Sequence, residues 1–221
     1  MSTGKPVVLV LMNGRPLALE WEYNYVPTIV EAWHLGIQMG PAVARVLSGA
    51  VNPEGRLSSS FPGKTGQCPV YYNHPNTGRP GSKSKFTSRY LDAPLDAIYP
   101  FGYGLSYTTY TYSDLTVAEQ DDALDISVKV ENTGDRDGRE TVQLYMQDVA
   151  ATLVRPVKEL KGFEKVALAA GEEKTVHFRL KKQDMGFFDN DRNYRLEDGL
   201  FCIYVGGSSR DCLMQEVSLK F

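Results

Sequence analysis

The second half of the chain alternates between apolar and polar residues, and this alternation constrains the fold more than any other feature. From residue 124 onward, apolar side chains recur at every second position. They form five runs: Leu124, Ile126, Val128 and Val130; Val142, Leu144 and Met146; Val176, Phe178 and Leu180; Phe201, Ile203 and Val205; Val217, Leu219 and Phe221. This period predicts strands with one buried face. About seven such strands in roughly a hundred residues predict a β-sandwich of the immunoglobulin or fibronectin type III kind.

The first half of the chain has the pattern of an α/β domain. Residues 7–12 form a continuous apolar run, which is typical of a strand covered on both faces in a parallel sheet. Residues 26–33 predict a second strand, residues 36–49 a helix that begins close to Pro41, and residues 56–61 a third strand. Because nothing before residue 7 supplies neighbouring strands, we expect either a partner chain that completes the sheet or a longer protein of which this is the end.

Residues 99–110 separate the two patterns and read YPFGYGLSYTTY. Half of these residues are aromatic or proline, a composition that suits a rigid segment between two packed bodies better than a flexible linker. We therefore expect residues 1–98 to be the C-terminal part of an α/β domain, residues 99–110 an interdomain joint, and residues 111–221 the sandwich. Three aromatic side chains of the joint should pack between the two domains: Phe101, Tyr103 and Tyr107.

A long loop rich in glycine, proline, asparagine, serine and lysine precedes the joint, at residues 63–95. Loops of this length in compact proteins are usually functional or mobile. The Arg79 guanidinium offers several hydrogen-bond donors near aromatic and hydroxyl side chains, a combination that can bind a sugar. The alternative is that Arg79 has a structural role. For Arg89, Tyr90 and Asp92, which lie nearest the joint, we favour a structural role that ties the loop to the two domains.

The α/β part offers one further site candidate, His34, beside Trp33 at the end of the second predicted strand. Strand ends in α/β sheets face ligand crevices, so both side chains are candidates for substrate contact, and a structural hydrogen bond for His34 is the alternative. Glu20 and Glu22, two apart on an extended stretch, would project to one side, as a carboxylate pair for glycosidic hydrolysis requires. Exposure to solvent is the simpler interpretation, because charged residues are mostly exposed.

Composition excludes several functions. The net charge is −3 with scattered lysines and arginines, so no nucleic-acid partner is expected. The longest apolar run is too short to span a bilayer and no leader precedes it, so we expect no membrane association. Asp189, Asp191 and Asn193 begin like a calcium loop, but the following residues lack its glycine and glutamate, and the three histidines share no metal-ligand spacing. No metal site is predicted.

The three cysteines, Cys68, Cys202 and Cys212, form no CxxC pair. They indicate neither a disulfide framework nor a zinc site. Cys202 and Cys212 could pair across neighbouring strands, and burial as small apolar side chains is the alternative that we favour.

Five stretches of the chain carry a family resemblance: VVLVLMNGRPLAL at 7–19, NPEGRLSSSFP at 52–62, PVYYNHPNTGRP at 69–80, FTSRYLDAPLDAIYPFGYGLSYTTY at 86–110 and RPVKELKGFEKVALAAGE at 155–172. With these stretches the chain resembles the C-terminal part of glycoside hydrolase family 3, most closely the bacterial periplasmic β-glucosidases. Members of that family have an N-terminal (β/α)8 barrel with an aspartate nucleophile, an α/β sandwich domain with a glutamate acid/base, and often a fibronectin type III-like domain.

The resemblance implies a parent that is a retaining β-glucosidase, which releases terminal β-linked glucose or a related sugar without metal or organic cofactor. Both catalytic residues lie upstream of this chain in the family, so none is assigned here and we expect the chain alone to be inactive. The implied partners are the barrel, the rest of the α/β domain, and an oligosaccharide or β-glucoside; a homo-oligomer is left open. The implied location of the parent is periplasmic or secreted.

The helix that follows Trp33 departs from the family pattern. The family reads approximately W-x-x-G-x-E-x-G-x-A, whereas this chain has Gln38 in place of the acid and Pro41 after the second glycine. A role for that acid therefore cannot be carried over, although proline near a helix start costs the fold little.

Two other functions stay open. The sandwich could be a carbohydrate-binding or adhesive module that acts without the barrel, or the chain could be one half of a split β-glucosidase or β-xylosidase. We favour a structural role for the sandwich, because its predicted outward residues are mostly charged and lack the planar aromatic row that stacks on sugars.

Overall fold

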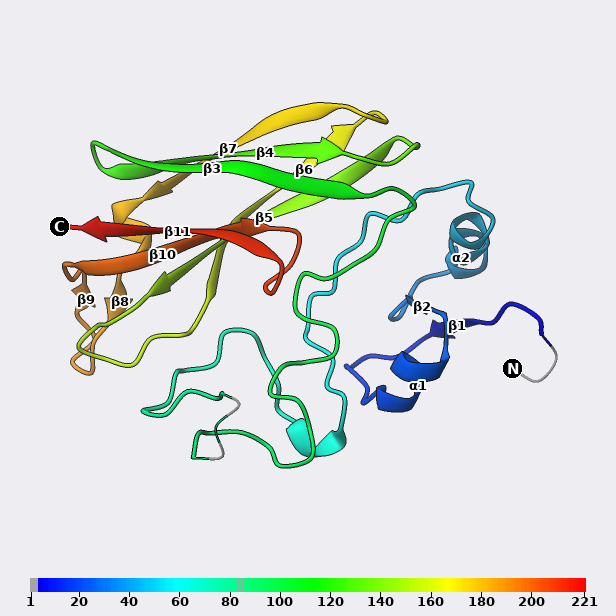
Figure 1. Ribbon diagram of the computed structural model, residues 1–221, viewed down its shortest axis with the longest axis horizontal. Coiled ribbons are helices and arrows are strands. Elements are labelled where there is room, and N and C mark those ends of the chain that lie inside the picture. Colours follow the sequence, from blue (N-terminus) through cyan, green and yellow to red (C-terminus); the bar gives the residue numbers. More distant parts are fainter. Residues whose placement is uncertain (1–3, 83, 85) are drawn as a thin grey trace.

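The computed structural model describes residues 4–82, 84 and 86–221. Lys85, in the long loop of residues 63–95, therefore lies outside the described residues, as does the chain start at residues 1–3. Figure 1 shows two parts, a smaller N-terminal one with short elements on long loops and a larger C-terminal one made of two facing sheets. None of the described helices is long and apolar enough to cross a membrane.

The described residues of the N-terminal part form one parallel strand pair and two short α-helices. Its elements are β1 (Val8–Leu11), α1 (Glu20–Tyr25), β2 (Thr28–Glu31), α2 (Met39–Leu47) and the 3-10 turn η1 (Thr65–Gln67). Pro41 lies in the first turn of α2, where its missing N–H costs no hydrogen bond, and Gly49 follows the helix with a φ of +76°. No residue of α1 or α2 is buried, and Ile37 just before α2 is fully exposed. The pair and its helices therefore present apolar surface that this chain does not cover.

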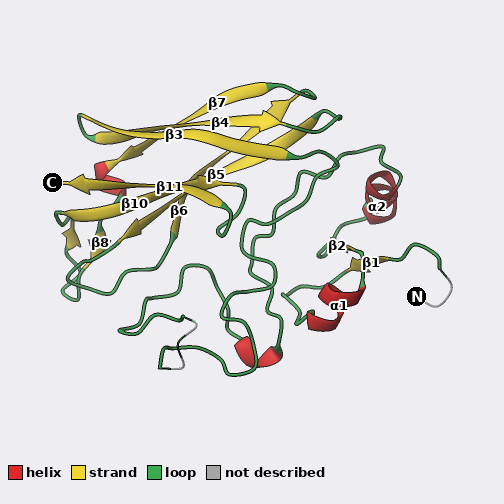
Figure 2. Ribbon diagram, viewed as in Figure 1, coloured by secondary structure: helices red, strands yellow, loops and turns green. Residues whose placement is uncertain are grey.

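The C-terminal part is a seven-stranded antiparallel sandwich (Figures 1 and 2). One sheet has the strand order β11-β10-β5-β6 and the other the order β3-β4-β7. The strands are β3 (Tyr110–Gln120), β4 (Ala123–Asn132), β5 (Gly138–Asp148), β6 (Glu159–Leu168), β7 (Glu173–Lys181), β10 (Gly199–Gly206) and β11 (Cys212–Leu219). A small hairpin of β8 (Phe187–Phe188) and β9 (Tyr194–Arg195) follows the 3-10 turn η2 (Lys182–Asp184). The fold class predicted from the alternation is confirmed.

The core lies between the two sheets, where the alternating apolar residues meet. Those of β4, β5 and β10 are at most 2% exposed: Leu124, Ile126, Val128, Val130, Val142, Leu144, Met146, Phe201, Ile203 and Val205. Burial of such side chains contributes roughly 1.5–3 kcal/mol each. Phe221 differs from the prediction, because it lies beyond β11 and is 39% exposed.

Strand β5 is buried on both faces, contrary to the one-sided pattern. Its outward residues Gln143 and Tyr145 are 3% and 0% exposed, because the joint and the loop before it cover this face of the sheet. The Gln143 side-chain amide donates to Gly102 O at 3.0 Å and to Gly207 O at 2.6 Å. Phe101 and Tyr72 both meet the Tyr145 ring edge to face. The sandwich is thus packed against the N-terminal part at the centre of this sheet face, where β5 lies.

Residues 56–61, predicted as a third strand, form no regular strand. Their backbone pairs instead with the joint: Leu57 N–H donates to Tyr103 O at 2.8 Å, Gly102 N–H to Leu57 O at 2.7 Å, and Phe61 N–H to Tyr99 O at 2.9 Å. An isolated antiparallel bridge joins Phe61 to Tyr99. The apolar–polar pattern of these residues therefore reflects pairing with the joint and not with β1 and β2.

The buried Asn132 side chain fixes the end of β4. It accepts from the Thr108 hydroxyl, and its amide donates to Arg136 O at 2.7 Å and Leu168 O at 3.2 Å. We expect Asn132→Ala to lower the free energy of unfolding by about 1–3 kcal/mol, because buried partners lose their hydrogen bonds. Urea denaturation followed by circular dichroism measures this loss.

Asn24→Ala is the matched control, because Asn24 is exposed and its amide donates only to Glu20 O within α1. Its expected effect is within about 0.5 kcal/mol, as for most surface substitutions. Equal losses in the two variants would contradict the role assigned to Asn132.

Candidate functional site

The carboxyl end of β2 holds Trp33 and His34. Trp33 has a φ of +50°, in the left-handed region, and its N–H donates to Glu31 Oε1 at 2.8 Å. Its ring lies 5.7 Å from that of Phe61. His34 is exposed and its ring rests on Gly14, where a Cβ would come within 3.0 Å of His34 Nε2. A non-glycine residue held at positive φ beside a strand end is a feature that clusters at functional sites.

Arg79 lies in a different place. The loop of residues 76–92 runs below the sandwich, away from the β1–β2 pair (Figure 1). The two limbs of this loop are tied by Ser88 N–H, which donates to Arg79 O at 3.0 Å, and by the hydroxyls of Thr77 and Ser88 at 3.2 Å. The Arg79 side chain is exposed. The three candidate substrate-binding residues therefore form one pair, Trp33 and His34, and one separate residue.

Among the three predicted aromatic residues of the joint, the contacts of Phe101 reach both parts of the molecule. Phe101 stacks on Tyr72 with 4.3 Å between ring centroids, and it meets Tyr145 of β5 at 6.5 Å. Tyr103 stacks on Tyr99 at 5.4 Å. Tyr107 is 41% exposed, and its hydroxyl donates to Val46 O of α2 at 2.6 Å.

The residues that precede the joint contact the N-terminal part. The Tyr90 hydroxyl donates to Gln67 O at 3.5 Å, and Lys64 Nζ donates to Asp92 O at 2.6 Å. Arg89 is exposed. The contacts described for Tyr90 and Asp92 thus hold the loop to its own domain, and the predicted link to the sandwich for all three residues stays a prediction.

A buried ion pair joins the two parts, and the sequence patterns did not reveal it. Arg56 Nη2 pairs with Glu140 Oε2 of β5, and the Tyr112 hydroxyl donates to Glu140 Oε1 at 2.7 Å. The side chains of Arg56 and Glu140 are 9% and 4% exposed. Burial raises the pKa of the Glu140 carboxyl, and Arg56 opposes that shift. Burial, and next the Glu140 carboxylate, raises the pKa of Tyr112 far above its usual range. The only sequence signal was an acid at an inward position of a strand.

Glu20 and Glu22 lie in helix α1 and not on an extended stretch, so that expectation was wrong. Two residues apart on a helix point in nearly opposite directions, since each residue turns the helix by about 100°. They therefore cannot form the carboxylate pair of a glycosidase. Among the described residues, no group of three or more His, Cys, Asp or Glu side chains could hold a metal ion.

The cysteines are free thiols. In the β10–β11 ladder Cys202 lies opposite Glu216, and Cys212 lies opposite Gly206. Four ladder positions separate the two, or about 14 Å at the rise of a strand, which is far beyond the reach of a disulfide. Cys202 is buried and Cys212 is partly exposed, and burial raises the pKa of the Cys212 thiol to about 11.

Two family models match the chain. The glycosyl hydrolase family 3 C-terminal domain matches residues 1–107, and the fibronectin type III-like domain matches residues 140–209. The first model covers the β1–β2 pair, the long loop and most of the joint, and the second lies within the sandwich.

Longer relatives match nearly the whole chain. A periplasmic β-glucosidase of Salmonella typhimurium is 49% identical over 94% of this chain and 28% of its own length. A β-xylosidase of Formosa agariphila is 41% identical over 98% of the chain and 30% of its own length. A crystal structure of a mutant β-glucosidase from Listeria innocua in complex with laminaribiose superposes over the whole chain with a TM-score of 0.94, at 44% identity and 31% of that protein.

The chain therefore belongs to glycoside hydrolase family 3, of which it represents the C-terminal part. It spans less than a third of the length of these relatives. Gln38, which replaces the acid of the family pattern, is the N-cap residue of α2 and makes no side-chain capping bond.

Proposed function

We propose that this chain is the non-catalytic C-terminal part of a retaining β-glucosidase that removes terminal β-linked glucose, or a related sugar, from oligosaccharides or glycosides. One observation carries the proposal: β-glucosidases match this chain over both of its parts, including the joint, at 44–49% identity. The role of the chain in that enzyme is to complete the α/β domain beside the barrel and to brace it with the sandwich. Trp33 and His34 are the residues proposed to approach the substrate, and Arg79 is a second, separate candidate.

We expect the purified chain to be inactive towards an aryl β-glucoside. Retaining hydrolysis needs two carboxyl groups about 5–5.5 Å apart, and the pair in α1 points in diverging directions. Release of the aryl group, followed by absorbance, should equal that of a buffer blank. Turnover above the blank would overturn the assignment as a non-catalytic part.

Co-production with an N-terminal family 3 portion tests the positive half of the proposal. A complex that elutes together and hydrolyses the aryl β-glucoside is expected, because the uncovered surface of β1, β2 and α2 would then be buried. The same preparation shows the oligomeric state by sedimentation. If the two portions neither associate nor hydrolyse the substrate, the proposed parent activity is wrong.

The sugar that the parent prefers is proposed as glucose, with xylose as the second candidate, because relatives named β-xylosidase match the chain at 41% and 38% identity. A periplasmic or secreted location is proposed for the parent, by analogy with the periplasmic relative. Comparing aryl β-glucoside with aryl β-xyloside in the co-produced enzyme distinguishes the two sugars.

A separate carbohydrate-binding role for the sandwich has less support. The centre of one sheet face is occupied by the joint, through contacts such as that between Phe101 and Tyr145. On the other sheet the outward residues are short polar or charged side chains, such as Thr116, Ser127 and Arg179.

A further inference from the structure

A hollow of about 420 Å³ lies at the seam between the two parts of the molecule. Its walls come from the long loop and the joint on one side, and from β5, β10 and the segments that follow them on the other. Small-molecule sites occur preferentially at domain interfaces, with volumes of roughly 300–1,000 Å³. The hollow is therefore large enough for a single small ligand and lies where such ligands bind.

Aromatic side chains form much of the wall. Tyr71, Tyr72 and Tyr204 line the hollow, and Tyr71 is 46% exposed. The positions of the other two are fixed: Tyr72 stacks on Phe101 at 4.3 Å, and the Tyr204 hydroxyl donates to Gln147 Oε1 at 2.8 Å. Because these two rings are already held in place, they lose little conformational entropy when a ligand binds.

Lys158 supplies a positioned cation at the hollow. Its ammonium lies 4.1 Å from the centroid of the Tyr204 ring and donates to Ser209 O at 2.6 Å. An ammonium has three donors, so the group can hold a ligand oxygen while it keeps the contact with Ser209. Burial lowers the pKa of Lys158, which is consistent with a group enclosed by protein.

Groups of opposite charge share the rim. Arg210 lines the hollow and donates to Ala97 O, and Asp96 contributes a carboxylate. An anionic ligand would meet Asp96, and a cationic ligand would meet Lys158 and Arg210. A neutral sugar ring with many hydroxyls suits Asp96, Lys158 and Arg210 alike, because each hydroxyl both donates and accepts hydrogen bonds. The apolar faces of the sugar ring would cover the aromatic surface.

We propose that this seam hollow is an accessory binding site for a single pyranose sugar such as glucose, held by Lys158, Asp96 and Arg210 against the tyrosine rings. The choice of a sugar rests on the proposed function, but the site is separate from the strand end that bears Trp33 and His34. A sugar bound there bridges the sandwich and the N-terminal part and stabilises their contact.

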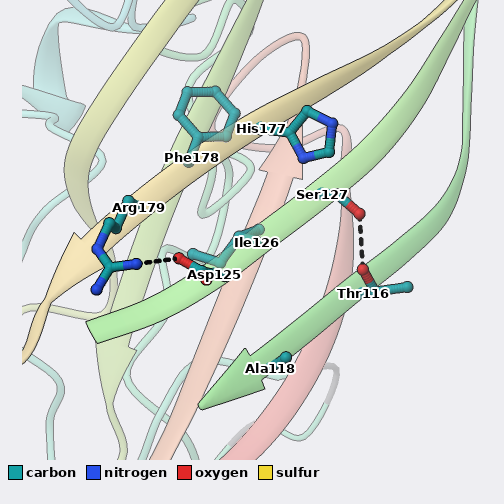
Figure 3. Close-up of a pocket in the computed structure, with 8 residues that line it drawn as sticks. All are labelled: Thr116, Ala118, Asp125, Ile126, Ser127, His177, Phe178 and Arg179. Atoms are coloured by element: carbon teal, nitrogen blue, oxygen red, sulfur yellow. Dashed lines mark hydrogen bonds and ion pairs between the residues drawn. The ribbon is translucent and has the colours of Figure 1, made fainter. Parts of the chain in front are cut away.

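A second hollow provides the contrast. It lies on the outer face of the β3-β4-β7 sheet (Figure 3), where the Thr116 and Ser127 hydroxyls bind each other at 2.7 Å and Arg179 pairs with Asp125 at 3.2 Å. Phe178 is the one phenylalanine or tyrosine among the described lining residues, and it packs against the core. The Thr116 and Ser127 hydroxyls and the Arg179–Asp125 pair already bind each other, and the residues described around the hollow include no tyrosine, so no sugar site is assigned to it.

Isothermal titration and thermal unfolding of the 221-residue chain with glucose test the proposal. Binding should saturate at glucose concentrations on the order of 100 mM for a site of millimolar affinity. Lys158→Met keeps the apolar stem over Tyr204 but removes the ammonium, and we expect about tenfold weaker binding, as for the loss of a hydrogen bond from a charged donor. Asp96→Asn, on an exposed side chain, tests the site without risk to the fold.

The controls separate this site from general effects. Sorbitol at equal concentration reports stabilisation by an excluded solute, and Arg179→Met reports binding at the other hollow. Saturable glucose binding that Lys158→Met and Asp96→Asn weaken, and that Arg179→Met leaves intact, supports the proposal. The absence of saturable binding, or unchanged affinity in both seam variants, overturns it. The hydrolysis assay with an N-terminal portion fails or succeeds independently of this result, so the two proposals can be distinguished.

Discussion

Arg56→Met should lower the free energy of unfolding by about 3–5 kcal/mol, the loss typical of removing one partner of a buried ion pair. The methionine fills the space of the arginine stem but leaves the Glu140 carboxylate, 4% exposed, without its cation. The Tyr112 hydroxyl, which would still donate to this carboxylate, lies on the sandwich side. Urea denaturation at neutral pH measures the change, and the contact between the two parts should be the first to weaken.

An exposed pair across the same seam provides the control. Arg139 Nη1 lies 3.4 Å from Glu54 Oε2, with side chains 51% and 41% exposed. Arg139→Met should cost at most about 1 kcal/mol, because solvent screens exposed pairs. The double variant Arg56→Met/Glu140→Gln should recover most of the loss, since no unpaired charge then remains buried. A loss in Arg56→Met no larger than in Arg139→Met would contradict the role of the buried pair.

The same ion pair predicts how the stability loss of Arg56→Met depends on pH. Burial already raises the folded pKa of Glu140 above its ordinary value, and Arg56 is the main force that opposes this rise. A carboxyl with a raised folded pKa binds more protons in the native state, so stability falls as pH increases from about 4 upward. Without Arg56 the rise is larger. The deficit of Arg56→Met should therefore be smallest in acid and should grow towards neutral pH.

The sandwich was predictable because its signal is local. Val128 and Val130 lie two residues apart on one strand, and a period of two needs no knowledge of any other segment. Trp33 and His34 could be placed at a strand end for the same reason, since the apolar run ends just before them. The helix of Glu20 and Glu22 was missed because six residues are too few for a helical period to be recognised.

The contacts across the seam could not be read from the sequence, because they join residues far apart in the chain. Arg56 and Glu140 are 84 positions apart, and the inward position of Glu140 on its strand does not indicate which cation pairs with it. Gln143 occupies an outward position that should face solvent, yet the joint covers it and its amide bonds Gly102 O. The seam hollow combines Tyr72, Lys158 and Arg210, so no local pattern could indicate it.

Gly102→Ala should be the most damaging single-methyl change in the joint, with a loss of about 2–5 kcal/mol. Two effects add. The residue has a φ of +79°, which costs a non-glycine residue about 1–2 kcal/mol. A Cβ there would also lie 1.9 Å from Gln143 Oε1 and 2.9 Å from the Tyr145 hydroxyl, and relieving such overpacking costs about 1–3 kcal/mol more.

Gly171→Ala separates the two effects, because Gly171 has nearly the same φ, +74°, but nothing within 4 Å of its Cβ position. It should lose only the backbone contribution, about 1–2 kcal/mol. The difference between the two variants in urea denaturation therefore measures how rigidly Gln143 and Tyr145 hold the joint against β5. Equal losses would mean that these side chains move aside freely, and that the joint is not a rigid connection between the two parts.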